Sequence, residues 1–358
     1  MEMNKYIFIY LFCLLMAVSC APRDRYITIR GYAQGGVYAV KMNLNGTDGM
    51  IKTSPEEIKD SIDSILGRID NSLSGYNRKS LLSKFNSGET VRPDSLFTDM
   101  YQKAYMFYRL TEGAVDAASA PLFDIWGFGF RTGEMPDDEK VSRTLLSSGM
   151  GRLEENMSEA VDKDGLLAPG ALLLDEDMPL PMLNYNALAQ GYSCDLVADY
   201  LYSIGVKDMM VDIGEIFCDG KNPSGQPWTL AIDRPVDGNN EAGADIQGIF
   251  RSPEGPHGIV TSGNYRKFYV MDGRKYAHTI DPRTGYPVGH NLLSATIVAD
   301  DALTADAYAT YCMVVGLEAS CRLLNSRSDM EGCLIYEEDG AMKTWCSDGF
   351  VLEPTSRK

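Results

Sequence analysis

Apolar and polar positions follow two different periods along the chain. In YITIRGYAQGGVYAVKM (26–42), apolar runs around a Gly-containing bend predict two short strands. In SPEEIKDSIDSILGRIDNSLS (54–74), apolar residues recur every three or four positions and predict a helix. Ser54 is its expected N-cap, Pro55 lies in the first turn, and Glu57 completes a capping box. The expected buried stripe consists of Ile58, Ile62, Ile65, Ile69 and Leu73.

The rest of the pattern predicts three more helices and several strands. The helices are expected at about 95–112, 187–204 and 305–324, the first two ending at Gly113 and Gly205. LLSATIVA, KDMMVDIGEIFCDG and PWTLAIDRP predict strands, the last two joined by the turn KNPSGQ. The polar stretch 134–177 is expected to form surface hairpins and loops. Helices and strands mix without regular βαβ alternation, and no linker divides the chain, so an α+β fold is predicted. A mature chain of about 340 residues predicts one large or two intimate subdomains.

The first residues indicate the compartment. Lys5 precedes an apolar run at 6–18 that is too short to span a bilayer, and small residues follow it, which is typical of a signal peptide. These small residues directly precede Cys20, as in a bacterial lipobox. We therefore expect residues 1–19 to be removed and Cys20 to become a lipidated N-terminus. The mature domain, 21–358, would then be anchored to a membrane on the periplasmic side. Ordinary secretion, with Cys20 incidental, is the alternative.

Composition excludes some classes of function. The net charge of −17 and the pI near 4.6 argue against a nucleic-acid partner, which requires basic patches. A polyanionic ligand would need a metal or backbone amides to offset this charge. None of the eight cysteines has CxxC or zinc-type spacing, which argues against a zinc site. The sequence does not show which cysteines form disulfides, and most of them are expected to be small buried hydrophobic residues.

The segment TADAYAT begins the last predicted helix. Asp306 and Thr310 are four residues apart, so their side chains project from one helix face. Two hard oxygen ligands on one face can form half of a magnesium or calcium shell. Alternatively, Asp306 favours the helix N-terminus electrostatically and Thr310 only packs.

Three other segments could carry chemistry. NYNALAQGYSCD (184–195) runs from a loop into a helix, where either anion binding or simple capping explains its polar residues. In VTSGNYRKF (260–268), Gly263 permits close backbone approach, and Tyr265 and Arg266 could stack or pair with charge; a hairpin turn is the alternative. YAHTIDPRTG (276–285) holds one of only three histidines, His278, followed by the turn residues DPRTG. His278 could be a general base or a structural residue. GxSxG, P-loop and GxGxxG motifs do not occur.

Taken in order, these segments resemble the ApbE family of FAD:protein FMN transferases. The resemblance runs from GYAQGGVYAV through LSGYNRKSLLSKFN, TEGAVDAASAPLFDIWGFG, ALAQGYSCD, DGKNPSGQPW and TSGNYRKF to YAHTIDPRTGYP and TADAYATYCMVVG. No single motif is diagnostic, but eight of them occur in the family's order. The resemblance implies a T-fold-like α+β body with an FAD cleft between its parts.

The resemblance also implies a reaction. Magnesium binds the pyrophosphate of FAD, and a Thr or Ser hydroxyl of an acceptor protein attacks the phosphorus of the FMN half. AMP leaves, and FMN remains on the acceptor through a phosphoester. The implied acceptors are subunits of the sodium-pumping NADH:quinone oxidoreductase and of Rnf-type complexes, modified in trans. Two alternatives stay open: magnesium-dependent hydrolysis of FAD to FMN and AMP, and a lipoprotein that binds flavin without turnover.

Site residues follow position by position from the resemblance. The implied magnesium ligands are Asp306, Thr310 and the main-chain carbonyl of Ala187, and His278 is the implied general base or orienting group. Many relatives carry Met, Asp and Lys where this chain has Gln34, Asn184 and Gln190, although amides can still hydrogen-bond flavin or adenine edges. The residues expected to contact FAD are Gln34, Tyr76, Ala114, Val115, Asp116, Asn184, Gln190 and His278.

Overall fold

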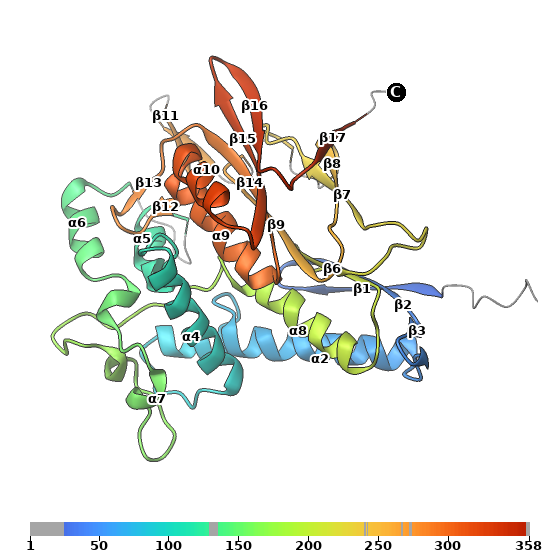
Figure 1. Cartoon of the computed structure of the whole chain (residues 1–358). Coiled ribbons are helices and arrows are strands. Elements are labelled where there is room, and N and C mark those ends of the chain that lie inside the picture. Colours follow the sequence, from blue (N-terminus) through green and yellow to red (C-terminus); the bar gives the residue numbers. More distant parts are fainter. Residues whose placement is uncertain are drawn as a thin grey trace, which may run out of the picture.

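Figure 1 shows a computed structural model of the chain, which describes residues 25–128, 135–239, 241, 243–265, 268–271 and 274–355. The predicted signal peptide, Cys20 and Arg266 lie outside these residues. Among the helices in the described ranges, none combines the length and apolarity needed to cross a membrane.

An antiparallel sheet of eight strands forms the centre of the fold, in the order β1-β2-β5-β6-β9-β14-β15-β16. The strands predicted within 26–42, in KDMMVDIGEIFCDG and in LLSATIVA all lie in this sheet and are confirmed. The bounds are β1 Tyr26–Ala33, β2 Gly36–Asn43, β5 Met209–Asp212, β6 Ile216–Asp219, β9 His257–Gly263, β14 Leu292–Ala299, β15 Met330–Glu338 and β16 Ala341–Cys346.

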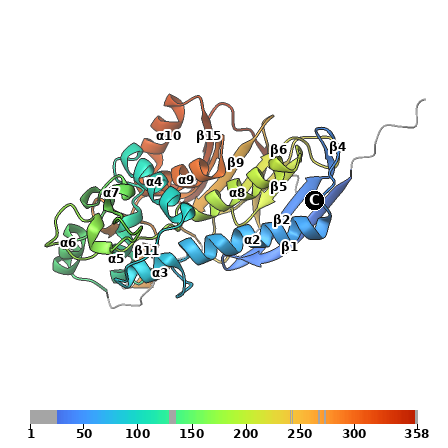
Figure 2. The same ribbon diagram turned by 90° about the horizontal axis from the view of Figure 1, so that it is seen from below.

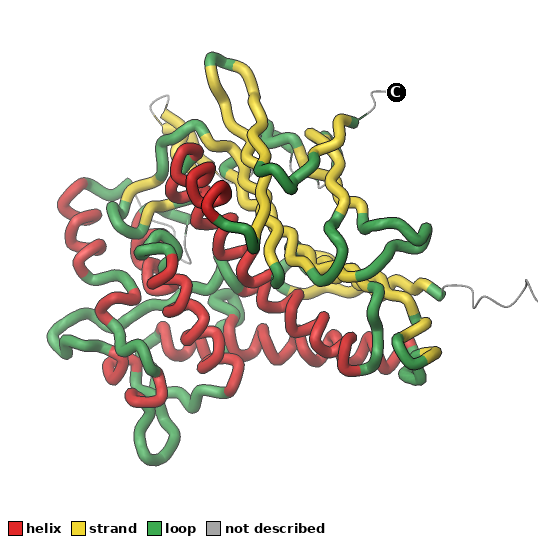
Figure 3. The backbone as a smooth tube through the Cα atoms, in the orientation of Figure 1, coloured by secondary structure: helices red, strands yellow, loops and turns green. Residues whose placement is uncertain are grey.

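The two faces of the sheet have different covers (Figures 2 and 3). Helices α2, α8, α9 and α10 cover one face, with α9 packed on β9, β14 and α8. The three-stranded sheet β17-β8-β7 covers the other face through a separate core that includes Trp228, Phe250 and Phe350. The predicted turn KNPSGQ, between β6 and β7, therefore connects the eight-stranded sheet to the three-stranded sheet. The bounds are α2 Pro55–Leu73, α8 Ala189–Ser203, α9 Ala302–Val315, α10 Leu317–Ser326, β7 Thr229–Asp233, β8 Ile246–Arg251 and β17 Leu352–Pro354.

Helix α2 confirms most of its prediction. Ser54 accepts from the Glu57 amide at 3.3 Å, and the Glu57 carboxylate accepts from the Ser54 amide at 2.9 Å, which completes the capping box. Four of the five stripe residues are buried, but Ile65 is only half-buried and Leu66 takes its place in the core. A step of four residues from Ile62 follows the helical period more closely than a step of three, so Leu66 lies on the buried face of the helix.

Two other predictions are wrong in part. The helix predicted at 305–324 is two helices, because Gly316 between them has φ +80°, where a Cβ would lie 2.9 Å from the His290 ring. In its described part, 135–177, the stretch forms short helices joined by loops rather than hairpins, with isolated bridges at Val91–Leu167 and Leu153–Leu173. The remaining elements are α3 Leu81–Asn86, α4 Ser95–Leu110, α5 Ala120–Ile125, α6 Asp138–Leu146, α7 Met157–Ala160, β3 Asn45–Gly46, β4 Gly49–Met50, β10 Phe268–Met271, β11 Arg274–Ala277, β12 Ile280–Asp281 and β13 Tyr286–Pro287, with 3₁₀ turns at Ala117–Ser119, Met150–Arg152 and Pro169–Leu172.

Candidate functional site

The contact between α8 and α9 contains a buried carboxylate. Asp306 of α9 is 4% exposed, and its Oδ2 accepts a hydrogen bond from the Gly191 amide of α8 at 3.1 Å. A Cβ at position 191 would lie 2.3 Å from the Ala302 carbonyl oxygen and 2.9 Å from the Asp306 Cβ, so glycine is required for this approach. Burial raises the pKa of Asp306 to about 7, and the Gly191 hydrogen bond opposes that shift.

The same hydrogen bond affects the start of α8. In a regular helix the Gly191 amide would donate to the carbonyl of Ala187, but here it donates to Asp306. Helix α8 consequently begins at Ala189, two residues later than predicted, and the Ala187 carbonyl is released from the helical ladder at the turn that Asp306 faces. Thr310 lies one turn beyond Asp306 on α9 and is half-buried. The three residues implied as magnesium ligands thus lie on α9 and in the turn immediately before α8, two helices that are in contact.

A second carboxylate braces these helices in the opposite direction. Asp195 of α8 accepts from the amides of Ala302 and Leu303, at the first turn of α9, at 2.8 and 2.9 Å. Such a site suits a carboxylate because helix N-termini carry free amides. Burial nevertheless raises the pKa of Asp195 to about 7. Sequence reasoning missed this role: the position of Asp195 on a predicted helix is visible in the sequence, but its partners 107 and 108 residues away are not.

The donor set fits a hard divalent cation. A carboxylate, a hydroxyl and a carbonyl supply only oxygen, which magnesium prefers. Among the described residues, the buried Asp306 carboxylate accepts one hydrogen bond, from Gly191, which leaves lone pairs for a ligand. The described ranges hold no group of three or more His, Cys, Asp or Glu residues suited to a metal. The magnesium ligands implied by the resemblance include a single carboxylate, Asp306, so they do not form such a group.

His278 lies between β11 and β12, where the polypeptide is anchored on both sides. Its ring meets that of Phe128 edge-on, with centroids 6.5 Å apart. The next residue, Thr279, donates from Oγ1 to the side-chain oxygen of Asn264 at 2.6 Å. The main-chain amide of Asn264 donates in turn to the Leu293 carbonyl at 3.0 Å. The end of β9, noted in the sequence as VTSGN, therefore fixes the backbone beside His278.

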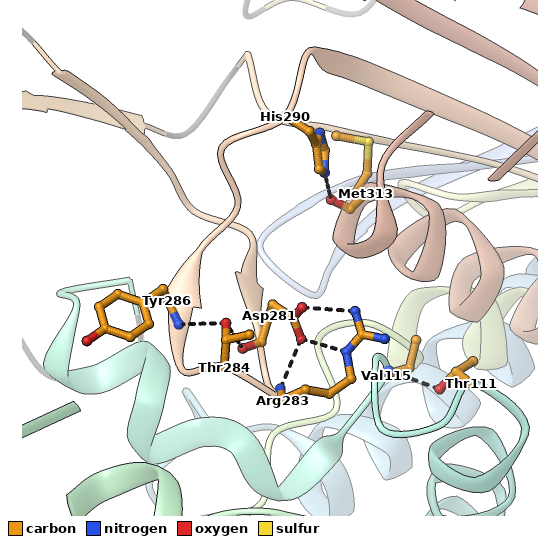
Figure 4. Close-up of polar contacts among 8 residues, drawn as sticks. All are labelled: Thr111, Val115, Asp281, Arg283, Thr284, Tyr286, His290 and Met313. Carbon is orange, nitrogen blue, oxygen red and sulfur yellow. Dashed lines mark hydrogen bonds and ion pairs between the residues drawn. The ribbon is translucent and has the colours of Figure 1, made fainter. Parts of the chain in front are cut away.

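The DPRTG segment forms the predicted turn (Figure 4). Asp281 accepts from the amide, Nε and Nη2 of Arg283, each at 2.9 Å, and its carbonyl accepts from the Gly285 amide at 2.8 Å. Trp126 of the α5 C-cap donates from Nε1 to the Gly285 carbonyl at 2.7 Å, which docks the turn on the helices. The Arg283 side chain reaches Gly113, where an added Cβ would lie 3.6 Å from its Cγ. The turn after His278 thus contacts the segment that leads into Ala114–Asp116.

The segment 114–116 offers mainly backbone to a ligand. The side chains of Ala114 and Val115 are 1% and 3% exposed. The Asp116 carboxylate accepts from the amides of Ala118 and Met150 at 2.8 and 3.0 Å, and burial raises its pKa to about 6. Any FAD contact by Ala114 or Val115 would therefore come from main-chain groups.

The other expected FAD-contact residues form a band around the start of α8. Gln34, at the β1–β2 turn, donates to Ser193 at 2.5 Å, and Gln190 donates to the Ile213 carbonyl at 3.2 Å. The main-chain amide of Asn184 donates to the Ala117 carbonyl at 2.7 Å, so this band adjoins the segment 114–116.

Tyr76 completes that band at the surface. It is 68% exposed, and its hydroxyl accepts from the Asn186 side chain at 3.1 Å. Two surface hollows, one beside Arg92 and Met157 and the other between α2 and α8, are lined by other residues. The FAD cleft implied by the resemblance stays a prediction, defined by the candidate residues.

The α+β fold and this oxygen-donor site can be compared with known proteins. The family model described as "ApbE family" matches residues 35–334, so the chain belongs to the ApbE family. The resemblance seen in the sequence is thereby confirmed.

Relatives of similar length support this assignment. A protein of Vibrio cholerae named FAD:protein FMN transferase is 30% identical over 94% of this chain and 95% of its own length. A protein of Escherichia coli K12 with the same name is 32% identical over 84% and 83%. The crystal structure of the Pseudomonas stutzeri flavinyl transferase ApbE superimposes with a TM-score of 0.75 at 28% identity, covering 92% and 96% of the two chains. The flavin transferase ApbE of V. cholerae superimposes with a TM-score of 0.73 at 29% identity, covering 91% and 98%. The predicted α+β, ApbE-like fold is confirmed.

Proposed function

We propose that this protein is a FAD:protein FMN transferase that moves the FMN half of FAD onto a Thr or Ser hydroxyl of an acceptor protein and releases AMP. Family membership and the relatives' names support the transferase class. The observation that carries the finer proposal is the buried Asp306 carboxylate beside the released carbonyl of Ala187. A protein of net charge −17 has a reason to place a cation site where a pyrophosphate binds.

The magnesium ligands and His278 have separate roles in this reaction. Asp306, Thr310 and the Ala187 carbonyl would hold magnesium, which when bound offsets the charge of the pyrophosphate. His278 accepts the proton of the acceptor hydroxyl while its oxygen forms a bond to the FMN phosphorus. The bond from that phosphorus to the AMP oxygen breaks, so the products are a phosphoester and AMP. The docked turn at Asp281–Gly285 keeps His278 oriented.

The band of residues around α8 would hold FAD. Tyr76 presents an exposed ring suited to stacking on the isoalloxazine, and the amides of Gln34 and Gln190 would hydrogen-bond polar edges of flavin or adenine. We also propose that the acceptor is a redox subunit of the sodium-pumping NADH:quinone oxidoreductase or Rnf type.

The test combines two measurements in one tube. The protein is incubated with FAD, magnesium and an acceptor fragment, then run on a denaturing gel viewed for flavin fluorescence while AMP is assayed. A fluorescent acceptor band with an equal amount of AMP is the expected result. AMP without a band, for a fragment flavinylated by a known transferase in parallel, would identify an FAD hydrolase. Absence of both signals, with FAD still bound to the protein, would favour a flavin carrier.

We further propose that the domain is tethered on the periplasmic side of a membrane through lipid on Cys20. Strand β1 begins at Tyr26, so only a few residues would separate the lipid from the folded domain. The test is labelling with a fatty-acid analogue in cells. Label that is absent from Cys20→Ser would support the anchor, and unlabelled wild-type protein would indicate ordinary secretion.

A further inference from the structure

Two cysteines face each other on neighbouring strands, away from the candidate site. Cys333 of β15 and Cys346 of β16 are direct register partners in an antiparallel pair, and both are free thiols. Both side chains pack with the core between the eight-stranded and three-stranded sheets. The candidate site lies on the opposite, helix-covered face.

The register places the two cysteines at a closely spaced position. The Ser347 amide donates to the Gly332 carbonyl at 2.9 Å, so the neighbouring pair 332/347 is joined by a backbone hydrogen bond. Pairs alternate along an antiparallel ladder, which makes 333/346 a non-hydrogen-bonded pair with Cα atoms about 4.5 Å apart. Disulfides span Cα separations of about 4.4–6.8 Å, so the backbone already meets their requirement.

We propose that Cys333 and Cys346 form a reversible cross-strand disulfide. This inference does not depend on the proposed function. The link would join the open end of the β15–β16 hairpin, at the point where the chain leaves the sheet. Beyond it, Phe350 stacks on Phe250 of β8 with ring centroids 4.1 Å apart, and β17 pairs with β8. The disulfide would therefore tie the crossing between the two sheets to the central sheet.

The two thiols differ in solvent exposure and in pKa, and these differences determine which thiol reacts first. Cys333 is 1% exposed, whereas Cys346 is half-buried on the last strand of the sheet. Hydrogen bonding with Cys346, together with burial, raises the pKa of Cys333, and hydrogen bonding with Cys333 lowers the pKa of Cys346. Thiolate character and access favour attack by Cys346.

The reaction is thiol–disulfide exchange with a small-molecule or protein disulfide. Cys346 as a thiolate attacks one sulfur of the oxidant, forming a mixed disulfide and expelling the first thiol, which takes up the proton from Cys346. Cys333 then loses its proton and attacks Sγ of Cys346, expelling the second thiol. The second thiol takes up the proton from Cys333. The protein loses two protons and two electrons in total, and the oxidant gains them to become two thiols.

The experiment uses reduced full-length protein and glutathione disulfide. After native incubation and acid quenching, free thiols are alkylated, and intact mass and a non-reducing peptide map are recorded. We expect loss of two hydrogen atoms, loss of two alkylated thiols and a peptide link between positions 333 and 346 that dithiothreitol removes. The oxidised protein should show a higher Tm than the reduced protein, with unchanged FMN transfer. Full alkylation of both cysteines, or a link to another cysteine, would overturn the proposal.

Variants test the order of attack. Cys333→Ser should stop at a glutathione adduct on Cys346, and Cys346→Ser should leave Cys333 unmodified. Cys321→Ser, on helix α10, is the matched control and should retain the link. If Cys333→Ser fails to fold, Cys333→Ala replaces it, and the wild-type map still decides the outcome.

Discussion

The Gly191 amide of α8 and the Asp306 carboxylate of α9 are joined by a hydrogen bond of 3.1 Å. Asp195 of α8 makes the converse contact by accepting from the first amides of α9. Each helix therefore supplies a carboxylate to the backbone of the other. This reciprocal bracing holds Asp306 against the turn that carries the Ala187 carbonyl.

Gly191→Ala should disrupt this junction. The new Cβ would meet the Ala302 carbonyl at 2.3 Å and must push the helices apart. We expect the free energy of unfolding to fall by about 1–3 kcal/mol and FMN transfer to fall with it. Urea unfolding and acceptor fluorescence measure the two effects.

Gly67→Ala is the matched control for that change. Gly67 lies inside α2, and a Cβ there would meet no atom within 4 Å. Alanine should be neutral or stabilise the protein by up to about 1 kcal/mol, because it favours helix over glycine. Equal behaviour of the two variants would show that the helices do not need close approach at Gly191.

Asp306→Asn should separate magnesium binding from folding. The amide keeps an oxygen for the Gly191 hydrogen bond but removes the charge that a cation needs. We expect transfer to fall more than about 100-fold, since even outer-shell changes cost up to that factor, while FAD binding and stability change little. AMP release is followed against magnesium concentration, and unchanged turnover at saturating magnesium would exclude Asp306 as a ligand.

The sequence predicts best those features that depend on neighbouring residues. The capping box of Ser54 and Glu57 and the spacing of Asp306 and Thr310 are local, and the structure places each on the expected helix. The stretch 134–177 shows the limit of such reasoning. Asp137 caps α6, which is an ordinary helix signal, but Val141 is the only buried residue of that helix and so leaves no apolar stripe to detect.

Features that depend on distant partners could not be predicted. Helix α8 begins late because the Gly191 amide is taken by a residue 115 positions away. The break between α9 and α10 falls at Gly316, which has φ +80° and packs against His290, a residue between β13 and β14. The motif order indicated the family, but the bracing role of Asp195 follows only from three-dimensional contacts.

His278→Ala should remove transfer and spare FAD binding. Loss of a general base typically costs about 100- to 10,000-fold in rate. FAD binding is measured by fluorescence and transfer by the in-gel assay. His257→Ala is the control, because the side chain of His257, at the start of β9, hydrogen-bonds with the local Glu254 carbonyl at 3.1 Å. A parallel loss of FAD affinity in His278→Ala would instead assign that residue to flavin binding.

The ionisation of Asp195 should make stability depend on pH. Burial raises its pKa from 3.8 to about 7 in the folded protein, although two backbone amides favour the charged form. Between these values the unfolded chain has lost the proton and the folded protein still binds it, so the free energy of unfolding falls as pH rises, by about 1.4 kcal/mol per unit of pKa shift. Below 3.8 both states hold the proton, and the contribution is constant.

Asp195→Asn removes this titration while keeping one oxygen as an acceptor. Urea unfolding of both proteins across this pH range should show the wild type losing stability relative to the variant as pH rises. The two curves should become parallel above the folded pKa, because Asp195 is then ionised in both states. A relative gain by the wild type would mean that the amides of Ala302 and Leu303 outweigh burial. In that case the charged carboxylate itself would be the form that joins α8 to α9.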